Sequence, residues 1–340
     1  MADRAVLQTA SSGGGTTTTT PLPPAVARAV GALDDPEPRV RLAAADVLGA
    51  AASAAAGSGD PLAVWTAARP TLLRLIARDW DRDAAATAGA EGDALPADAP
   101  PSLPHTTGAL PPAATASEQG GGTMSVASIL ASSYAPQPPG AGEMRHGTEG
   151  WRCLETAVRA LLAVMDGCGP AFAAAAPPGG EVEALLTRAA LHPNRFVREA
   201  AYGALGGLAA LAGPAADDDP ASAAFITATA ARLGADGLAE NWSQVRLAAC
   251  VAARALLLGC PPPPSPTRAA ALASLLPALA LNRYDAAEGV ASYSQATWAA
   301  VMGRGGPSAV AAHAPAVVAH YLKAAKTNNH QAREAAAVCC

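Results

Sequence analysis

Histidine and cysteine, the residues best suited to bind a metal ion or to attack a carbonyl group, are scattered along this 340-residue chain. His313 and His320 are seven residues apart and could share one face of a helix, but two helical turns are too far for one ion. Zinc needs three or four convergent donors, so we expect no metal site. The histidines are His105, His146, His192, His313, His320 and His330.

The six cysteines show neither a C-x-x-C pair nor a matching histidine spacing. They lie in apolar stretches of helical pattern, which indicates reduced, buried thiols in a cytoplasmic protein, with the nucleus as the other compartment. Cys339-Cys340 matches the end of a doubly prenylated chain, but the apolar helix expected before it favours a buried helix. The other cysteines are Cys153, Cys168, Cys250 and Cys260.

Sequence signatures of bound nucleotides and of catalytic nucleophiles are missing from the chain. No glycine is followed by lysine, as a phosphate-binding loop requires. Neither a G-x-S-x-G nor an H-E-x-x-H pattern occurs. The sequence therefore predicts a protein with no catalytic residue and no cofactor.

Alanine dominates the composition and indicates an all-α fold. Hydrophobic residues make up 51% of the chain, but aromatic residues only 4% and charged residues only 15%. Alanine is the strongest helix former, and valine and isoleucine do not gather in the alternating runs expected of strands. Every apolar run is interrupted by a charge, a proline or a polar residue before it reaches about 18 residues, so we expect no membrane-spanning helix.

Two segments have compositions that disfavour a packed core. Residues 1–22 are rich in Ser, Gly and Thr, lack the apolar centre of a secretory signal, and are expected to form a disordered tail. Residues 79–147 are rich in Ala, Pro, Gly, Ser and Thr and are expected to form a long disordered insertion. An apolar island within it, residues 124–134, is either a docking motif or residual helicity without a partner, and the second reading is favoured.

A five-residue motif recurs along the rest of the chain. Residues 40–44 (Val-Arg-Leu-Ala-Ala) have counterparts at 197–201, at 245–249 and, more weakly, at 332–336. Each copy follows a short polar turn that can cap a helix, and its apolar residues recur at the spacing of one helix face. The motif therefore predicts the second helix of a helix pair.

The spacing of the copies indicates a regular period. Arg198 and Arg246 are 48 residues apart (246 − 198), whereas Arg246 and Arg333 are 87 apart (333 − 246), close to two periods. A skipped copy is therefore expected with Glu288 in the arginine position. The first helices are expected upstream of the turns, with kinks at Pro277 and Pro315, at 181–191, 221–233, 267–281 and 308–325.

This pattern resembles that of HEAT repeats, a family of armadillo-like α-solenoids. The resemblance covers residues 23–78 and 148–340 and implies about six stacked helix pairs. The chain ends within an amphipathic run without a capping pair, so we expect it to be truncated at its C-terminus. In this family an acid in the turn and the arginine of the motif form a ladder between neighbouring repeats. Here that implies structural roles for Asp35, Arg41, Arg198, Arg246 and Arg333, with His192, Glu240 and Thr327 in place of the family's aspartate.

The function expected from the resemblance is a non-catalytic scaffold or adaptor that binds other proteins. Residues 241–340 carry eight basic and three acidic residues (8 − 3 = +5), which suits an acidic partner, but no dense cluster indicates nucleic acid. The alternatives are a cofactor lyase or chaperone that holds a small molecule in its groove, and a tubulin- or nucleic-acid-binding solenoid. The candidate protein-binding residues are Arg195, Trp242, Lys323, Lys326, Asn328 and Asn329.

Overall fold

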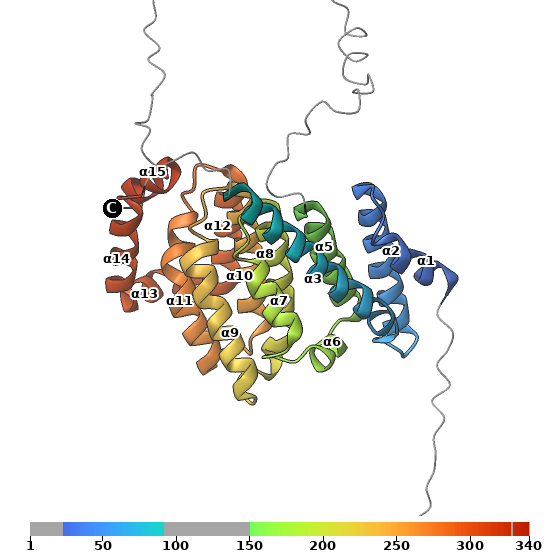
Figure 1. Ribbon diagram of the computed structural model, residues 1–340. Helices are drawn as coiled ribbons and strands as arrows, with labels where there is room; N and C mark the ends of the chain where they lie inside the picture. Colours follow the sequence, from blue (N-terminus) through green and yellow to red (C-terminus); the bar gives the residue numbers. More distant parts are fainter. Residues whose placement is uncertain (1–22, 92–149, 328, 340) are drawn as a thin grey trace, which may run out of the picture. The chain divides into compact units, whose positions relative to one another are not determined.

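The computed structural model describes residues 23–91, 150–327 and 329–339, and every regular element in these ranges is a helix (Figure 1). The all-α prediction is confirmed. The tail at 1–22, residues 92–147 of the insertion and Asn328 lie outside the described residues.

Five helices, of which three contain the sequence motif, pack one against the next. They are α2 (Pro38–Gly57), α5 (Trp151–Cys168), α8 (Arg195–Ala212), α10 (Ser243–Gly259) and α12 (Glu288–Met302). Their buried faces are mostly leucine and alanine. Polar side chains begin two of them, since Glu37 accepts the backbone N–H of Arg39 and Asn194 accepts that of Phe196.

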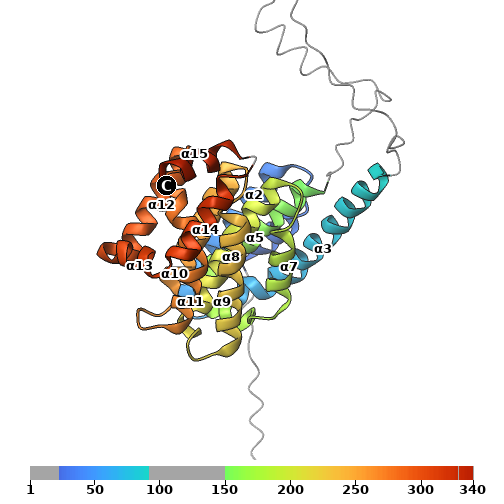
Figure 2. The ribbon, with the colours of Figure 1, turned by 90° about the vertical axis from the view of Figure 1, so that its left-hand side faces the viewer.

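A second series of helices alternates along the chain with the motif helices. It comprises α1 (Pro24–Ala32), α3 (Ala63–Glu91), α7 (Glu181–Ala189), α9 (Pro220–Arg232) and α11 (Pro266–Asn282), and it is continued after α12 by α14 (Ala314–Ala324), which packs on α11 and on the helix that follows it. In both views α7, α9 and α11 lie side by side (Figures 1 and 2). The described chain is completed by α6 (Ala171–Ala175), α13 (Gly306–Ala312), α15 (His330–Cys339) and the short turns η1 (Gly213–Ala215), η2 (Leu233–Gly237) and η3 (Gly303–Gly305).

Two expected helix boundaries were wrong. The helix expected over 308–325 is divided at His313 into α13 and α14, because Pro315 stands at the start of α14, where its missing N–H costs no hydrogen bond. Helix α3 continues past Arg78 to Glu91, into the expected insertion, because residues 79–91 are alanine-rich and contain no proline. Pro70 and Pro277 do lie inside α3 and α11.

Glycine and alanine let the helices of the motif series approach one another closely. A Cβ atom added to Gly206 of α8 would lie 2.5 Å from the Cα atom of Ala252 in α10. A Cβ atom on Gly167 of α5 would lie 2.5 Å from the carbonyl oxygen of Gly49 in α2. Small residues at these contacts are therefore a packing requirement, and they account for part of the alanine and glycine content.

By length and mean hydropathy, one described helix, α2, is of the kind that could cross a membrane. Its apolar composition has another explanation in the fold, since Leu48 and Ala52 are fully buried and α2 packs along α5. Arg41 in its first turns is also buried, at 3% exposure. The expectation of no membrane partner stays a prediction.

Two glycines of α8 provide a test of this packing. We expect Gly206→Ala to lower the free energy of unfolding by about 1–3 kcal/mol, because the new methyl group would push α8 and α10 apart. Gly203→Ala should leave it unchanged or raise it by up to about 1 kcal/mol, because a Cβ atom there makes only an ordinary contact with Leu162, at 3.5 Å. Urea denaturation of both variants measures the difference. Equal effects would show that the close approach at Gly206 does not constrain the helices.

Candidate functional site

Each arginine of the motif binds the turn that precedes its own helix. The Nη1 group donates to carbonyl oxygens five or six residues earlier, which closes the turn against the helix start. The contacts join Arg41 to Asp35 (2.7 Å) and Pro36 (3.0 Å), Arg198 to His192 (2.8 Å) and Pro193 (2.7 Å), Arg246 to Glu240 (2.7 Å) and Asn241 (3.0 Å), and Arg333 to Thr327 (2.9 Å).

The other edge of the guanidinium reaches the next helix pair. Arg198 Nε donates to Glu240 Oε2 at 2.8 Å. Arg246 binds Asp285 with two parallel bonds, Nε to Oδ2 at 2.8 Å and Nη2 to Oδ1 at 2.9 Å, and the two side chains are only 3% and 7% exposed. Such paired contacts fix the geometry of both groups. We call these contacts the arginine ladder.

The first and last copies of the motif differ from this pattern. Arg41 Nε donates to the hydroxyl of Thr156 at 2.8 Å, in place of a carboxylate. The carboxylate of Asp35 accepts the backbone N–H of Glu37 at 2.8 Å, within its own turn. Arg333 is exposed.

The expected position of the skipped copy was wrong. Asp285 accepts the N–H of Ala287, two residues later, at 2.8 Å, as Asp35 does with Glu37. Since Arg41 follows Asp35 by six residues, the arginine position after Asp285 is Ala291 (285 + 6), not Glu288. The same offset of six joins Glu240 to Arg246 and could have identified Asp285 from the sequence.

Aromatic rings and guanidinium groups stack along the starts of three helices. The Arg195 guanidinium lies 3.9 Å from the ring centroid of Trp242 and 4.7 Å from that of Phe196. Phe196 stacks on Trp151 with centroids 5.1 Å apart and planes 16° apart, and Arg152 lies 5.3 Å from the centroid of Trp151. These five residues are called the turn strip.

The structure thus brings Arg195 and Trp242 together, as two members of one surface. Trp242 is 48% exposed and Arg152 is exposed, whereas the other three side chains are half-buried. Sequence reasoning missed Trp151 and Phe196, which a search for aromatic residues at helix starts could have found. Arginine and tryptophan are the side chains most often found at energetic centres of protein interfaces.

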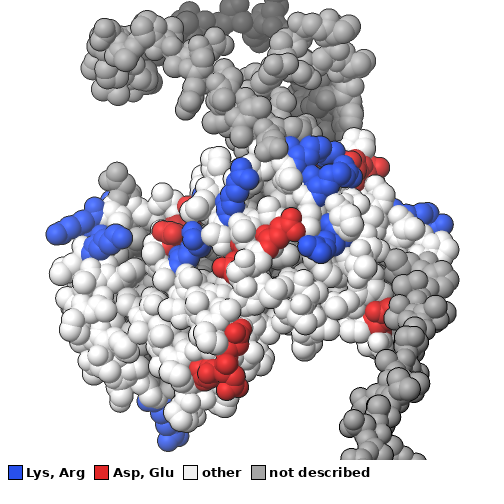
Figure 3. Space-filling model, turned by 60° about the horizontal axis from the view of Figure 1, so that its bottom comes forward, with Lys and Arg blue, Asp and Glu red and all other residues white. Residues whose placement is uncertain are grey.

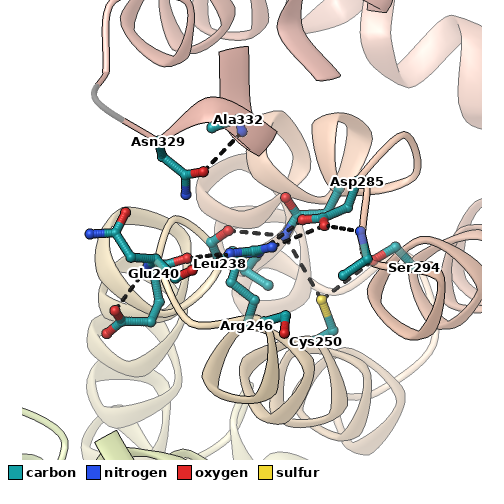
Figure 4. A network of polar contacts seen from close by, with 12 residues as sticks. Leu238, Glu240, Arg246, Cys250, Asp285, Ser294, Asn329 and Ala332 are labelled. Atoms are coloured by element: carbon teal, nitrogen blue, oxygen red, sulfur yellow. Dashed lines mark hydrogen bonds and ion pairs between the residues drawn. The ribbon is translucent and has the colours of Figure 1, made fainter. Parts of the chain in front are cut away.

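Two of the remaining candidates border a cavity near the end of the described chain. Lys323 and Asn329 line it together with His320, Arg246 and Asn282, and its volume is about 120 Å³. Asn329 faces the turn that carries Leu238 and Glu240 (Figure 4). Lys326 is exposed and does not line this cavity. The candidates therefore fall into two groups, the turn strip and this C-terminal cavity.

The C-terminal cavity lies where the packing changes. Helix α15 packs on α11 and α14, and these helices share a small apolar cluster that is separate from the main core. Its buried members are Leu281, Ala324, Ala335 and Ala336.

Metal ligands and thiols are the groups that bear on chemistry at both surfaces and in the core around them. Among the described residues, no group of three or more His, Cys, Asp and Glu side chains could hold a metal ion. The thiol of Cys250 lies 3.3 Å from Ser294 Oγ, and burial raises its pKa, which makes it a poor nucleophile.

The arginine ladder predicts a large difference between two equivalent arginines. We expect Arg246→Ala to lower the free energy of unfolding by about 3 kcal/mol, because it leaves the Asp285 carboxylate buried without its cation. Arg333→Ala should change it by less than about 0.5 kcal/mol, because this side chain is exposed. Urea denaturation followed by circular dichroism measures both. A loss below about 1 kcal/mol for the Arg246 variant would contradict a structural role for the pair.

No protein-family model, curated protein or solved structure matches this chain. The functions proposed for the turn strip and the C-terminal cavity therefore rest on the geometry of these two surfaces.

Proposed function

We propose that this chain is a non-catalytic scaffold or adaptor whose helices form a HEAT-type α-solenoid of about six pairs. Two observations support the architecture. The motif helices pack in sequence order, and the same arginine contacts recur at the turns before three of them, α2, α8 and α10. Stacked helix pairs of this kind present long continuous surfaces, which suit extended protein partners.

The turn strip is the observation that carries the functional proposal. Its side chains come from three successive helix starts, so a partner that follows the strip would contact several helix pairs at once. The half-exposed Trp242 ring supplies apolar area at little entropic cost, and Arg195 and Arg152 supply donors for carboxylates or carbonyl oxygens. These are the properties of a protein-binding surface.

The distribution of charge supports an acidic partner in preference to nucleic acid. The C-terminal 100 residues carry a net charge of +5, as counted above. On the face shown in Figure 3, however, basic and acidic side chains are interspersed and much of the surface is uncharged. A nucleic-acid footprint would instead show basic residues clustered on one face.

The C-terminal cavity bears on the alternative of a cofactor lyase or chaperone. Its volume of about 120 Å³ is well below the 300–1,000 Å³ typical of pockets for organic cofactors. It can take a side chain, but not a large pigment. This cavity therefore gives no support to a pigment or an organic cofactor bound at this position.

We place the protein in the cytoplasm or the nucleus. Cys168, Cys250 and Cys260 are buried and form no disulfide. Such thiols persist in compartments where thioredoxin and glutathione keep cysteines reduced. Fractionation with a full-length tagged chain tests this placement.

Two substitutions at opposite ends of α10 test the proposed binding surface. We expect Trp242→Ala to weaken capture of a stoichiometric protein partner from native lysate at least about 30-fold, because it removes the most exposed aromatic ring of the turn strip. Leu258→Ala should leave capture unchanged, since Leu258 is equally exposed (47%, against 48% for Trp242) but lies away from the turn strip. Quantitative mass spectrometry of the captured proteins measures both.

Two outcomes would contradict the proposal. If both substitutions reduced capture equally, the turn strip would not be the contact. If a small molecule co-purified and no protein did, the scaffold function itself would be wrong.

A further inference from the structure

The C-terminal cavity has a polar base and a basic wall. At the base, Arg246 and Asn282 are 2% and 5% exposed. Asn282 Nδ2 donates to Leu238 O at 3.0 Å, so its position is fixed. His320 and Asn329 on the wall are half-buried, and Lys323 is exposed at the rim. Polar groups thus converge from α10, α11, α14 and the turn before α15.

The size of the cavity suits a side chain. Its volume of about 120 Å³ is somewhat smaller than an engineered cavity of about 150 Å³ that holds benzene, a molecule of six heavy atoms. The side chain of glutamate has five heavy atoms and that of aspartate has four. A nucleotide or a pigment is several times larger.

The charges that line the cavity favour an anion. Arg246 and Lys323 contribute two positive charges and Asp285 one negative, so the lining is +1 when His320 is neutral and +2 when it is protonated. The Asp285 carboxylate is already bound by one edge of the Arg246 guanidinium, through Nε and Nη2, and the Nη1 group binds the carbonyl oxygens of Glu240 and Asn241. Lys323 and His320 therefore remain as the groups that would meet an incoming carboxylate, and amide side chains of Asn282 and Asn329 lie beside them.

We propose that this cavity is a subsite for an acidic side chain, glutamate or aspartate, of the bound partner. This proposal rests on the scaffold function, and it specifies that the partner carries a carboxylate side chain where it contacts the cavity. Lys323 pairs with the carboxylate at the rim, and His320 donates a hydrogen bond from the wall. A carboxylate held by such charged donors is bound more strongly than one held by neutral groups.

The histidine makes binding depend on pH. Burial, and then the charge of Lys323, lower the pKa of His320 below its ordinary value. The other charged or titratable groups around it are Arg246, Asp285 and Tyr321. A bound carboxylate favours the imidazolium, so binding takes up a proton. Affinity therefore rises as the pH falls toward the pKa of His320, while a glutamate carboxylate stays ionised above about pH 4.3.

Two small probes of equal shape test the subsite without the partner. The full chain, labelled with ¹⁵N, is titrated with N-acetylglutamate α-methylamide and, separately, with the matching glutamine derivative. We expect the carboxylate probe to shift the amide resonances of Lys323 and Asn329 with a dissociation constant on the order of millimolar, and the amide probe to leave them unchanged.

Three variants identify the groups responsible. Lys323→Gln should weaken the carboxylate probe about fivefold, whereas Lys326→Gln, on an exposed side chain outside the lining, should not change its affinity. In His320→Gln the gain in affinity between about pH 7.5 and about pH 5.5 should disappear. A subsite that is only polar in character would bind both probes equally.

The outcomes separate this proposal from the scaffold function. If the carboxylate probe causes no shifts, binds no better than the amide, or is weakened equally by both lysine substitutions, the subsite proposal is overturned, and partner capture through Trp242 is unaffected. If the probe binds as expected but no partner is captured, the carboxylate site stands and the scaffold function falls.

Discussion

The structure depends on guanidinium groups that tie a helix and its own turn to the next helix pair, and the buried Arg246 is the one with the most contacts. Arg246 binds the carbonyl oxygens of its own turn through one edge and Asp285 of the next turn through the other. Removing both charges from water costs several kcal/mol per ion, and only close, well-aligned contacts offset that cost. Any other position of the next helix pair would leave these buried charges without their partners, at a high cost in free energy. The pair therefore fixes the distance between the two helix starts.

The turn strip exists because the helices come close enough for its rings to meet. Gly206 lets α8 approach α10 to a distance that excludes even a methyl group. At the other end of the same helix pair, Arg195 at the start of α8 lies on Trp242, which directly precedes α10. A chain with only 4% aromatic residues thus gathers three rings on one surface. The contact between α8 and α10 thus contributes both to the packing of the core and to the continuity of the turn strip.

The C-terminal cavity marks the point where this constraint ends. Ala291 stands where the ladder would need an arginine, so α12 provides no guanidinium for the turn that follows. The helices after it form their own small apolar cluster with α11. A gap lined by polar groups remains beside Arg246 and Asp285. The same buried pair therefore completes the ladder on one side and forms the base of the cavity on the other.

The sequence by itself determined the helices and their order, because the motif at 40–44, 197–201 and 245–249 has a helical period that short-range interactions enforce. It also pointed to Arg195 and Trp242. Only the tertiary structure decided which groups meet. Asp285 binds Arg246 across 39 residues, and Phe196 stacks on Trp151 across 45 (196 − 151). Such contacts depend on how closely whole helices approach one another. That distance is set jointly by the side-chain volumes on both helices, so it cannot be deduced from the pattern of one segment.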